Sequence, residues 1–214
     1  MPIEAVKEIL GFSISIFTIM NPLSAGAIML TLIGEKTTKN AVETIARKST
    51  KTVLIAMLVI FLSGTYIFSF FGIQADGLRV FGGIILLIMG FDMVQGRGKK
   101  TNHRTTEHEA AMRLADISVV PLSIPIIVGP GLTTTLINLS LTNNNWHSNM
   151  YIIIAILICS AGNYIIIRNM PHIKNRLGEN GIKVFSRLMG LVVGSLAAQM
   201  FLSGAFGLYN TYMP

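Results

Sequence analysis

Long apolar runs separated by short polar connections make up most of the sequence. Six runs approach or exceed the roughly 20 residues with which an α-helix crosses the hydrocarbon core of a bilayer. Their approximate bounds are 5–32, 53–71, 80–94, 117–141, 150–167 and 188–208. In lipid every backbone polar group must find its partner within the structure, which a helix achieves by itself. The pattern predicts an all-α polytopic membrane protein with six transmembrane helices.

The two halves of the sequence resemble each other. Residues 77–90 read GLRVFGGIILLIMG and residues 181–194 read GIKVFSRLMGLVVG, and each segment opens the last span of its half. The first spans of the halves match through Pro22 and Pro130, which small residues follow. Because each half has an odd number of spans, the repeats must be inverted. We expect one transmembrane domain over 1–214, with repeat one at about 5–95, a cytoplasmic loop at about 96–115 and repeat two at about 116–208.

Prolines deep inside the first and fourth runs predict broken helices. Proline removes a backbone donor and clashes with the carbonyl group four residues back. Asparagine is a good helix cap, and proline is favoured at the first helical position. Asn21-Pro22 and Gly129-Pro130-Gly131 therefore predict that spans 1 and 4 stop and restart near mid-membrane. A restarting helix offers free N–H groups and a positive dipole end, which suit a carboxylate. The alternative is a plain proline kink that neighbouring helices repair.

Polar side chains near the breaks extend the candidate site. Ser24 and Thr133 follow the two prolines and offer hydroxyl groups, although small residues at these positions also permit close helix packing. Gln199 is one of the few polar residues in the sixth run, and it aligns with Gln95 in the repeat. The candidate substrate-binding residues are Asn21, Pro22, Ser24, Gly129, Pro130, Gly131, Thr133 and Gln199.

The distribution of basic residues predicts the orientation in the membrane. Of the 17 Lys and Arg residues, all but Lys7 and Arg79 fall in the first, third and fifth connections or at the adjoining span ends. The positive-inside rule places these connections in the cytoplasm and both termini outside the cytoplasm. The net charge of +7 could indicate nucleic acid. Short basic loops between apolar runs are instead typical of contact with anionic lipid, so we expect no nucleic-acid partner.

Composition excludes several other classes of protein. The chain is 51% hydrophobic and only 13% charged, against about 25% charged residues in soluble domains. The single cysteine, Cys159, excludes an intramolecular disulfide and makes a cysteine-based metal site implausible. No nucleophile–base pair, phosphate loop or metal cluster is visible, so we expect neither an enzyme nor a cofactor. No charged residue falls in the centre of a span, which disfavours a proton pump built on buried carboxylates.

Several strings carry a resemblance to a known family. They are IMNPLSAG in the first span, GLRVFGGIILLIMGF in the third, ISVVPLSIPIIVGPG in the fourth, and GENGIKVFSRLMGL and LAAQMFLSG around the sixth. In these strings, over about 11–207, the chain resembles the MarC family of bacterial and archaeal inner-membrane proteins. The resemblance implies six spans in inverted repeats, and some members look like transporters of glycine or alanine. It places the substrate site at Asn21-Pro22 and the turn that follows, and at Gly129-Pro130-Gly131 with Thr133.

Three functions are compatible with this sequence. A secondary transporter of small neutral amino acids would hold the substrate carboxylate at the half-helix ends and alternate access by rocking of the repeats. An exporter of small apolar compounds would have a uniformly apolar central cavity. A non-transporting membrane scaffold would need Asn21 and Gly129 only for folding. The expected partners are a small-molecule substrate and the lipid bilayer, and the sequence leaves open whether the chain forms a homo-oligomer.

Overall fold

The computed structural model describes residues 2–33, 38–96, 122–143 and 145–213, and within them it is helical throughout, without strands. The elements are α1 (Pro2–Met20), α2 (Pro22–Ile33), α3 (Lys39–Phe70), α4 (Ala75–Gln95), the π-helical segment η2 (Leu122–Ile127), α6 (Pro130–Thr142) and α7 (Trp146–Tyr212). The expected all-α class is thereby confirmed for the described chain. Except for Gly96, the predicted loop 96–115 lies outside these residues, as does the start of the fourth run.

The long helices carry large apolar side chains on their outer surface. On α4 these side chains recur every three or four residues, and Phe81, Ile88 and Phe91 are each at least 60% exposed. Exposing such an apolar stripe to water is unfavourable, whereas contact with lipid is not. By length and composition, three described helices can cross a membrane: Ile3–Leu30, which includes the interruption at Asn21, Ala75–Gln95 and Trp146–Tyr212. The count of six spans stays a prediction.

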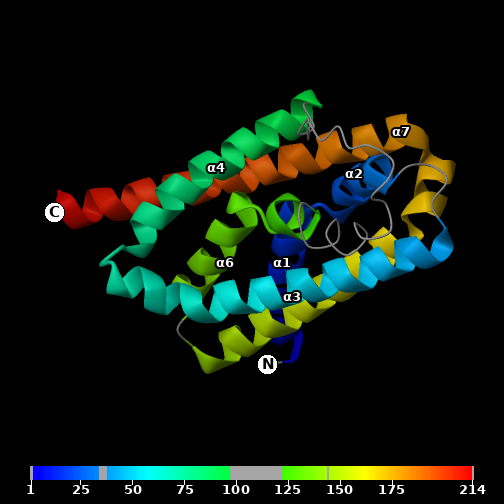
Figure 1. The fold of residues 1–214 in the computed structure, drawn as a ribbon. Coiled ribbons are helices and arrows are strands. Elements are labelled where there is room, and N and C mark those ends of the chain that lie inside the picture. The colour runs from blue at the N-terminus through cyan, green and yellow to red at the C-terminus, as the bar shows by residue number, and fades with distance from the viewer. Residues whose placement is uncertain (1, 34–37, 97–121, 144, 214) are drawn as a thin grey trace.

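Two pairs of long helices enclose the short ones. Figure 1 shows α4 beside the C-terminal half of α7, and α3 beside the N-terminal half of α7, with α1, α2 and α6 between the pairs. The buried side chains form one apolar cluster to which every helix contributes; it includes Ile16, Met29, Met57, Leu86, Ile127, Leu136, Ile156 and Val193. The half-helices that carry the candidate site thus lie inside the protein rather than at its edge.

The fifth and sixth predicted spans both lie within α7, on either side of a kink. The helical assignment runs for 67 residues, but Gly178 has φ 67° and ψ 173°. This left-handed backbone is strained for other residues and open to glycine. This backbone marks a kink between two helical parts of α7, and Figure 1 shows α7 changing direction on its right-hand side. A single glycine therefore replaces the connecting loop expected between 167 and 188.

Helix α3 begins well before the apolar run that predicted it. It starts at Lys39, and the Thr38 side chain accepts a hydrogen bond from the Ala41 N–H at 3.4 Å. Glu43 forms an ion pair with Arg47 one turn later, at 3.0 Å, and a second with Arg168 of α7, at 3.6 Å. A hydrogen bond that Arg47 donates to the Tyr164 side chain and the charge of Glu43 raise the pKa of Arg47 above its ordinary value. The basic residues expected in the first loop from Lys39 onward therefore extend a helix beyond its apolar part.

Candidate functional site

The first helix run is interrupted at one residue, Asn21. Its φ of 43° lies in the left-handed region, which asparagine tolerates better than most residues. The Asn21 N–H donates to the Phe17 carbonyl at 3.0 Å, and its own carbonyl accepts from the Ala25 N–H at 3.2 Å. Asn21 thus closes α1 and opens α2, with Pro22 at the first helical position. Helix geometry leaves the next N–H groups, those of Leu23 and Ser24, without acceptors in the helix.

The Asn21 side chain does not cap α2 in the usual way. Its Nδ2 donates to Ser24 Oγ at 2.8 Å, and Ser24 Oγ is hydrogen-bonded in turn to Ser186 Oγ of α7. The Asn21 Oδ1 atom is buried and has no hydrogen-bond partner. This chain of polar groups joins the start of α2 to a helix 162 residues away in sequence. Sequence analysis missed Ser186, because an isolated serine beside an apolar run carries no pattern.

The second interruption lies between η2 and α6. The Val128 N–H donates to the Ser123 carbonyl at 2.9 Å, which ends the π-helical segment. Gly129 follows with φ −87° and ψ 179°, an extended backbone that any residue adopts, and Pro130 begins α6. The Gly129 carbonyl accepts from the Thr133 N–H at 3.0 Å. The N–H groups of Gly131 and Leu132 therefore have no acceptor within α6.

A groove of about 650 Å³ runs along the start of α6. This volume lies in the range of small-molecule sites. Three of the expected residues, Gly129, Pro130 and Thr133, line the groove together with Thr134. The rest of the lining is mainly apolar and comes from α4 and its N-terminal approach, the residue after η2, and α6: Ile73, Gly77, Leu78, Phe81, Ile85, Val128 and Ile137.

The remaining candidate residues lie elsewhere. Asn21 and Pro22 are buried at the start of α2, and the half-buried Ser24 faces Ser186. Gly131 is buried against Leu86 of α4, where an added Cβ would lie 2.7 Å from Leu86 Cδ2. Gln199 is exposed on α7. The candidates therefore fall into two groups, at the starts of α2 and α6, and Gln199 belongs to neither of them.

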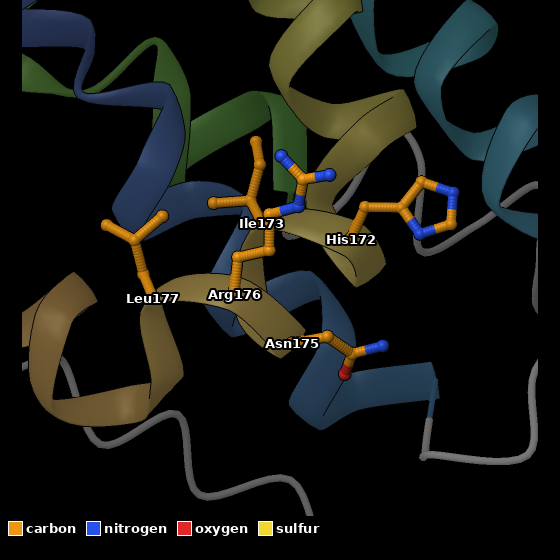
Figure 2. A pocket seen from close by; sticks show the side chains of 5 residues that line it. All are labelled: His172, Ile173, Asn175, Arg176 and Leu177. Atoms are coloured by element: carbon orange, nitrogen blue, oxygen red, sulfur yellow. The ribbon is translucent and has the colours of Figure 1, made fainter.

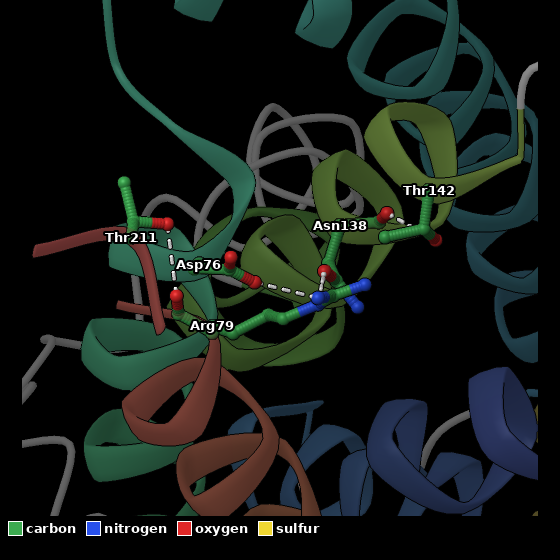
Figure 3. Close-up of polar contacts among 6 residues, drawn as sticks. Asp76, Arg79, Asn138, Thr142 and Thr211 are labelled. Atoms are coloured by element: carbon green, nitrogen blue, oxygen red, sulfur yellow. Dashed lines mark hydrogen bonds and ion pairs between the residues drawn. The ribbon is translucent and has the colours of Figure 1, made fainter. Parts of the chain in front are cut away.

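One polar network links α4 to α6 at one end of the groove. Figure 3 shows the Arg79 guanidinium between the side chains of Asp76 and Asn138. Arg79 Nη1 lies 2.6 Å from Asp76 Oδ1, and Arg79 Nε donates to Asn138 Oδ1 at 3.0 Å. The side chains of Asp76 and Arg79 are each 26% exposed, so water screens the pair only in part. The signal in the sequence was a single arginine among the few basic residues on the side predicted to lie outside the cytoplasm.

We expect a double-mutant cycle of Arg79→Ala and Asn138→Ala to give a coupling energy of about 1 kcal/mol, because a charge-assisted hydrogen bond is lost once and not twice. The free energy of unfolding in detergent micelles is the measurement. Thr142→Ala is the matched control: the Thr142 hydroxyl donates only to the Asn138 carbonyl within α6, at 2.8 Å. A coupling between Arg79 and Asn138 no larger than that between Arg79 and Thr142 would contradict this assignment.

A second hollow, of about 480 Å³, lies just before the turn at Gly178. It is lined by His172, Ile173, Asn175, Arg176 and Leu177. Figure 2 shows the His172 ring and the Arg176 guanidinium extending in different directions from α7. They do not converge on one point, which a polar ligand site requires. Among the described residues, no group of three or more His, Cys, Asp or Glu side chains could hold a metal ion.

Comparison with known proteins identifies the family. Residues 6–209 match the MarC family, whose description is "MarC family integral membrane protein". The chain is 34% identical over 199 residues to a UPF0056 membrane protein of Methanocaldococcus jannaschii. The matched region covers 93% of this chain and 96% of the relative. It is 34% identical over 208 residues to one of Pyrococcus horikoshii, with 97% and 99% covered.

A bacterial relative shows the same likeness. The UPF0056 membrane protein YvbG of Bacillus subtilis is 32% identical over 197 residues, with 92% of this chain and 93% of the relative covered. No solved structure matches the chain. The matches cover the interrupted helices α1–α2 and η2–α6 as well as the long ones. The chain belongs to the MarC family of integral membrane proteins and is a multi-pass membrane protein.

Proposed function

We propose that this protein is a secondary transporter of small neutral amino acids such as glycine and alanine. In this proposal six spans form two inverted repeats in the cell inner membrane, and both termini lie on the periplasmic side. The first and fourth spans are broken near mid-membrane, and the half-helix ends at α2 and α6 bind the substrate carboxylate. The resemblance of the sequence to amino-acid transporters of the family suggests the substrate class.

The matching hydrogen bonds at the two interruptions carry the proposal. Asn21 and Gly129 each precede a proline, and each accepts the first backbone hydrogen bond of the new helix, from Ala25 and from Thr133. Both half-helices therefore present free N–H groups at the same positions relative to the proline. Such ends favour anions through their hydrogen bonds and through the helix dipole. Discontinuous helices of this kind form the substrate sites of many secondary transporters.

The packing of the helices supports an inverted repeat. Helix α1 contacts α6, and α2 contacts η2, which is the exchange of partners that a twofold axis requires. Helices α4 and α7 cross where the backbones of Gly90 and Gly194 meet: a Cβ added to Gly90 would lie 2.8 Å from the Gly194 nitrogen. These two glycines are the last residues of the matching strings 77–90 and 181–194. Equivalent residues touch each other only near the axis that relates them.

Ligand-dependent melting of the purified protein tests the proposal. A ligand that binds only the folded state stabilises it by about 2.7 kcal/mol at a hundredfold excess over its dissociation constant. We expect glycine and alanine to raise the melting temperature, and we expect Gly129→Leu to abolish the shift. The extended backbone at Gly129 accepts leucine, whose side chain would fill the groove.

Gly11→Leu is the matched control, because a Cβ at Gly11 meets nothing within 4 Å. It should melt like the wild type and keep the shift. A shift that survives Gly129→Leu unchanged would rule out a carboxylate site at α6. If no amino acid shifts the melting temperature and deletion of the protein leaves the uptake and efflux of all small amino acids unchanged, the scaffold function would replace the proposal.

The apolar lining of the groove favours a second candidate, an exporter of small apolar compounds. Phe81, Val128 and Ile137 surround the polar end of α6 and would bind an uncharged ligand equally well. Competition between free and amidated amino acids separates the two candidates. An exporter of apolar compounds would bind both forms, whereas a carboxylate site rejects the amide.

A further inference from the structure

We infer that the interruption at Asn21 binds both charges of a zwitterionic substrate and that the Asn21 amide oxygen accepts a hydrogen bond from the substrate ammonium group. This inference rests on the proposed transport of amino acids. It adds that the ammonium group is recognised as well as the carboxylate. It also assigns this recognition to the α2 break and not to the α6 break.

The first observation is a buried acceptor without a donor. Asn21 is only 6% exposed, and its Oδ1 atom has no hydrogen-bond partner. Turning the amide would pair Oδ1 with the Ser24 hydroxyl, which Ser186 holds in place from α7, but it would leave Nδ2 buried without that partner. The orientation with Nδ2 on Ser24 leaves the acceptor free. An unpaired buried acceptor costs free energy, so a donor that arrives there is favoured. An ammonium group is the strongest donor that a small metabolite offers.

The second observation is the polarity of the two helix ends at the break. Helix α1 ends at Met20, so the carbonyl groups of its last turn form the negative end of its dipole. Helix α2 begins at Pro22, and its free N–H groups form a positive end. One residue, Asn21, separates them. In an α-amino acid the ammonium and carboxylate groups are likewise separated by a single carbon atom, so each can meet the end of opposite sign.

Among the described residues that line the α6 groove, none carries a side-chain amide to accept a hydrogen bond from an ammonium group. Gly129 stands at the position of Asn21 and has no side chain. The groove around it is mainly apolar, with only the hydroxyls of Thr133 and Thr134 among the side chains that line it. The two breaks are therefore alike in the hydrogen bond that opens the new helix and unlike in φ and in side chain. The α2 break recognises both charged groups of the substrate, and the α6 break accepts a carboxylate beside an apolar surface.

The test compares glycine with acetate, which has the carboxylate without the ammonium group. For the purified protein in detergent micelles, we expect glycine to bind at least roughly tenfold more tightly than acetate, the effect of one hydrogen bond to a charged group. Asn21→Gly removes the amide and keeps the positive φ accessible, so the backbone is not strained. In this variant the glycine affinity should fall roughly 10- to 100-fold, while the acetate affinity stays constant.

Asn163→Ala is the matched control. Asn163 is fully buried in α7 and, like Asn21, has an Oδ1 atom without a partner. Its Nδ2 donates a hydrogen bond to Thr50 Oγ1, and it does not lie at a helix break. It should lower stability and leave the ratio of glycine to acetate affinity unchanged. Equal affinities for glycine and acetate in the wild type, or an unchanged ratio in Asn21→Gly, would overturn the inference alone. Absence of glycine binding to the wild type would overturn both it and the proposed function.

Ser186 is a positioning residue in this scheme, because it fixes Ser24 and thereby the amide of Asn21. Ser186→Ala should shrink the ratio of glycine to acetate affinity, and Ser186→Thr, which keeps the hydroxyl, should restore it. A purely structural role would change the melting temperature of the ligand-free protein without changing this ratio.

Discussion

Replacing Gly90 with alanine is expected to lower the free energy of unfolding by about 3 kcal/mol, the upper end of the usual cost of overpacking. A Cβ at this position would lie 2.8 Å from the Gly194 nitrogen and 2.9 Å from the Gly190 carbonyl oxygen. Both obstacles are backbone atoms, so no side chain can rotate away, and α4 would have to separate from α7. Unfolding in detergent micelles, followed by circular dichroism, measures the effect.

Gly194 provides the control for this prediction. It lies at the same crossing, yet a Cβ added to it meets nothing within 4 Å. Gly194→Ala should therefore be neutral or slightly stabilising, since alanine favours the helix by about 1 kcal/mol over glycine. Equal destabilisation by the two alanine substitutions would mean that the helices do not cross in this way.

Leu86→Ala is expected to cost about 2–3 kcal/mol, the lower part of the range for a buried leucine. The chain unfolded in lipid keeps an apolar environment, so the lost free energy comes mainly from packing rather than from transfer to water. Leu86 is 1% exposed and lies between α4 and the first turn of α6. The loss should therefore loosen the start of the half-helix as well as the core.

A second substitution makes this prediction specific to the contact. A Cβ at Gly131 would lie 2.7 Å from Leu86 Cδ2 and 3.3 Å from Met89 Sδ. Gly131→Ala alone should cost about 1 kcal/mol, because the end of the leucine must give way. In the Leu86→Ala background the added methyl group occupies the vacated space, so it should be neutral or stabilising. Additive effects of the two substitutions would show that Leu86 does not pack on Gly131.

The first residues of α2 and α6 could be expected from the sequence because their cause is local. Pro22 and Pro130 cannot donate a backbone hydrogen bond, and a helix that meets such a residue either kinks or restarts there. In the structure α2 and α6 begin at these two prolines. The apolar runs likewise gave the approximate extent of α4, which is nearly all apolar.

The start of α3, the exposure of Gln199 and the contact of Ser186 could not be predicted, because they depend on features other than the hydropathy and proline pattern of the local sequence. The start of α3 at Lys39 was missed because hydropathy marks the apolar part of a helix and not its polar extension. Gln199 was expected at the site because it aligns with Gln95, but alignment does not tell which face of a helix a residue occupies. Its neighbour Ala197 is buried, whereas Gln199 is exposed. Ser186 joins the site only through folding, across 162 residues.

The glycine crossing of α4 and α7 determines how the two halves of the protein can move. With backbone against backbone at Gly90 and Gly194, the helices have no side chains there on which to slide. The same close approach recurs at Gly83, where an added Cβ would lie 2.8 Å from the Phe201 nitrogen, and at Gly204, where it would lie 2.8 Å from the Val80 nitrogen. Held at three levels, α4 and α7 would move as one rigid unit. In the proposed transporter, a change of access would then come from the other helices shifting against this pair.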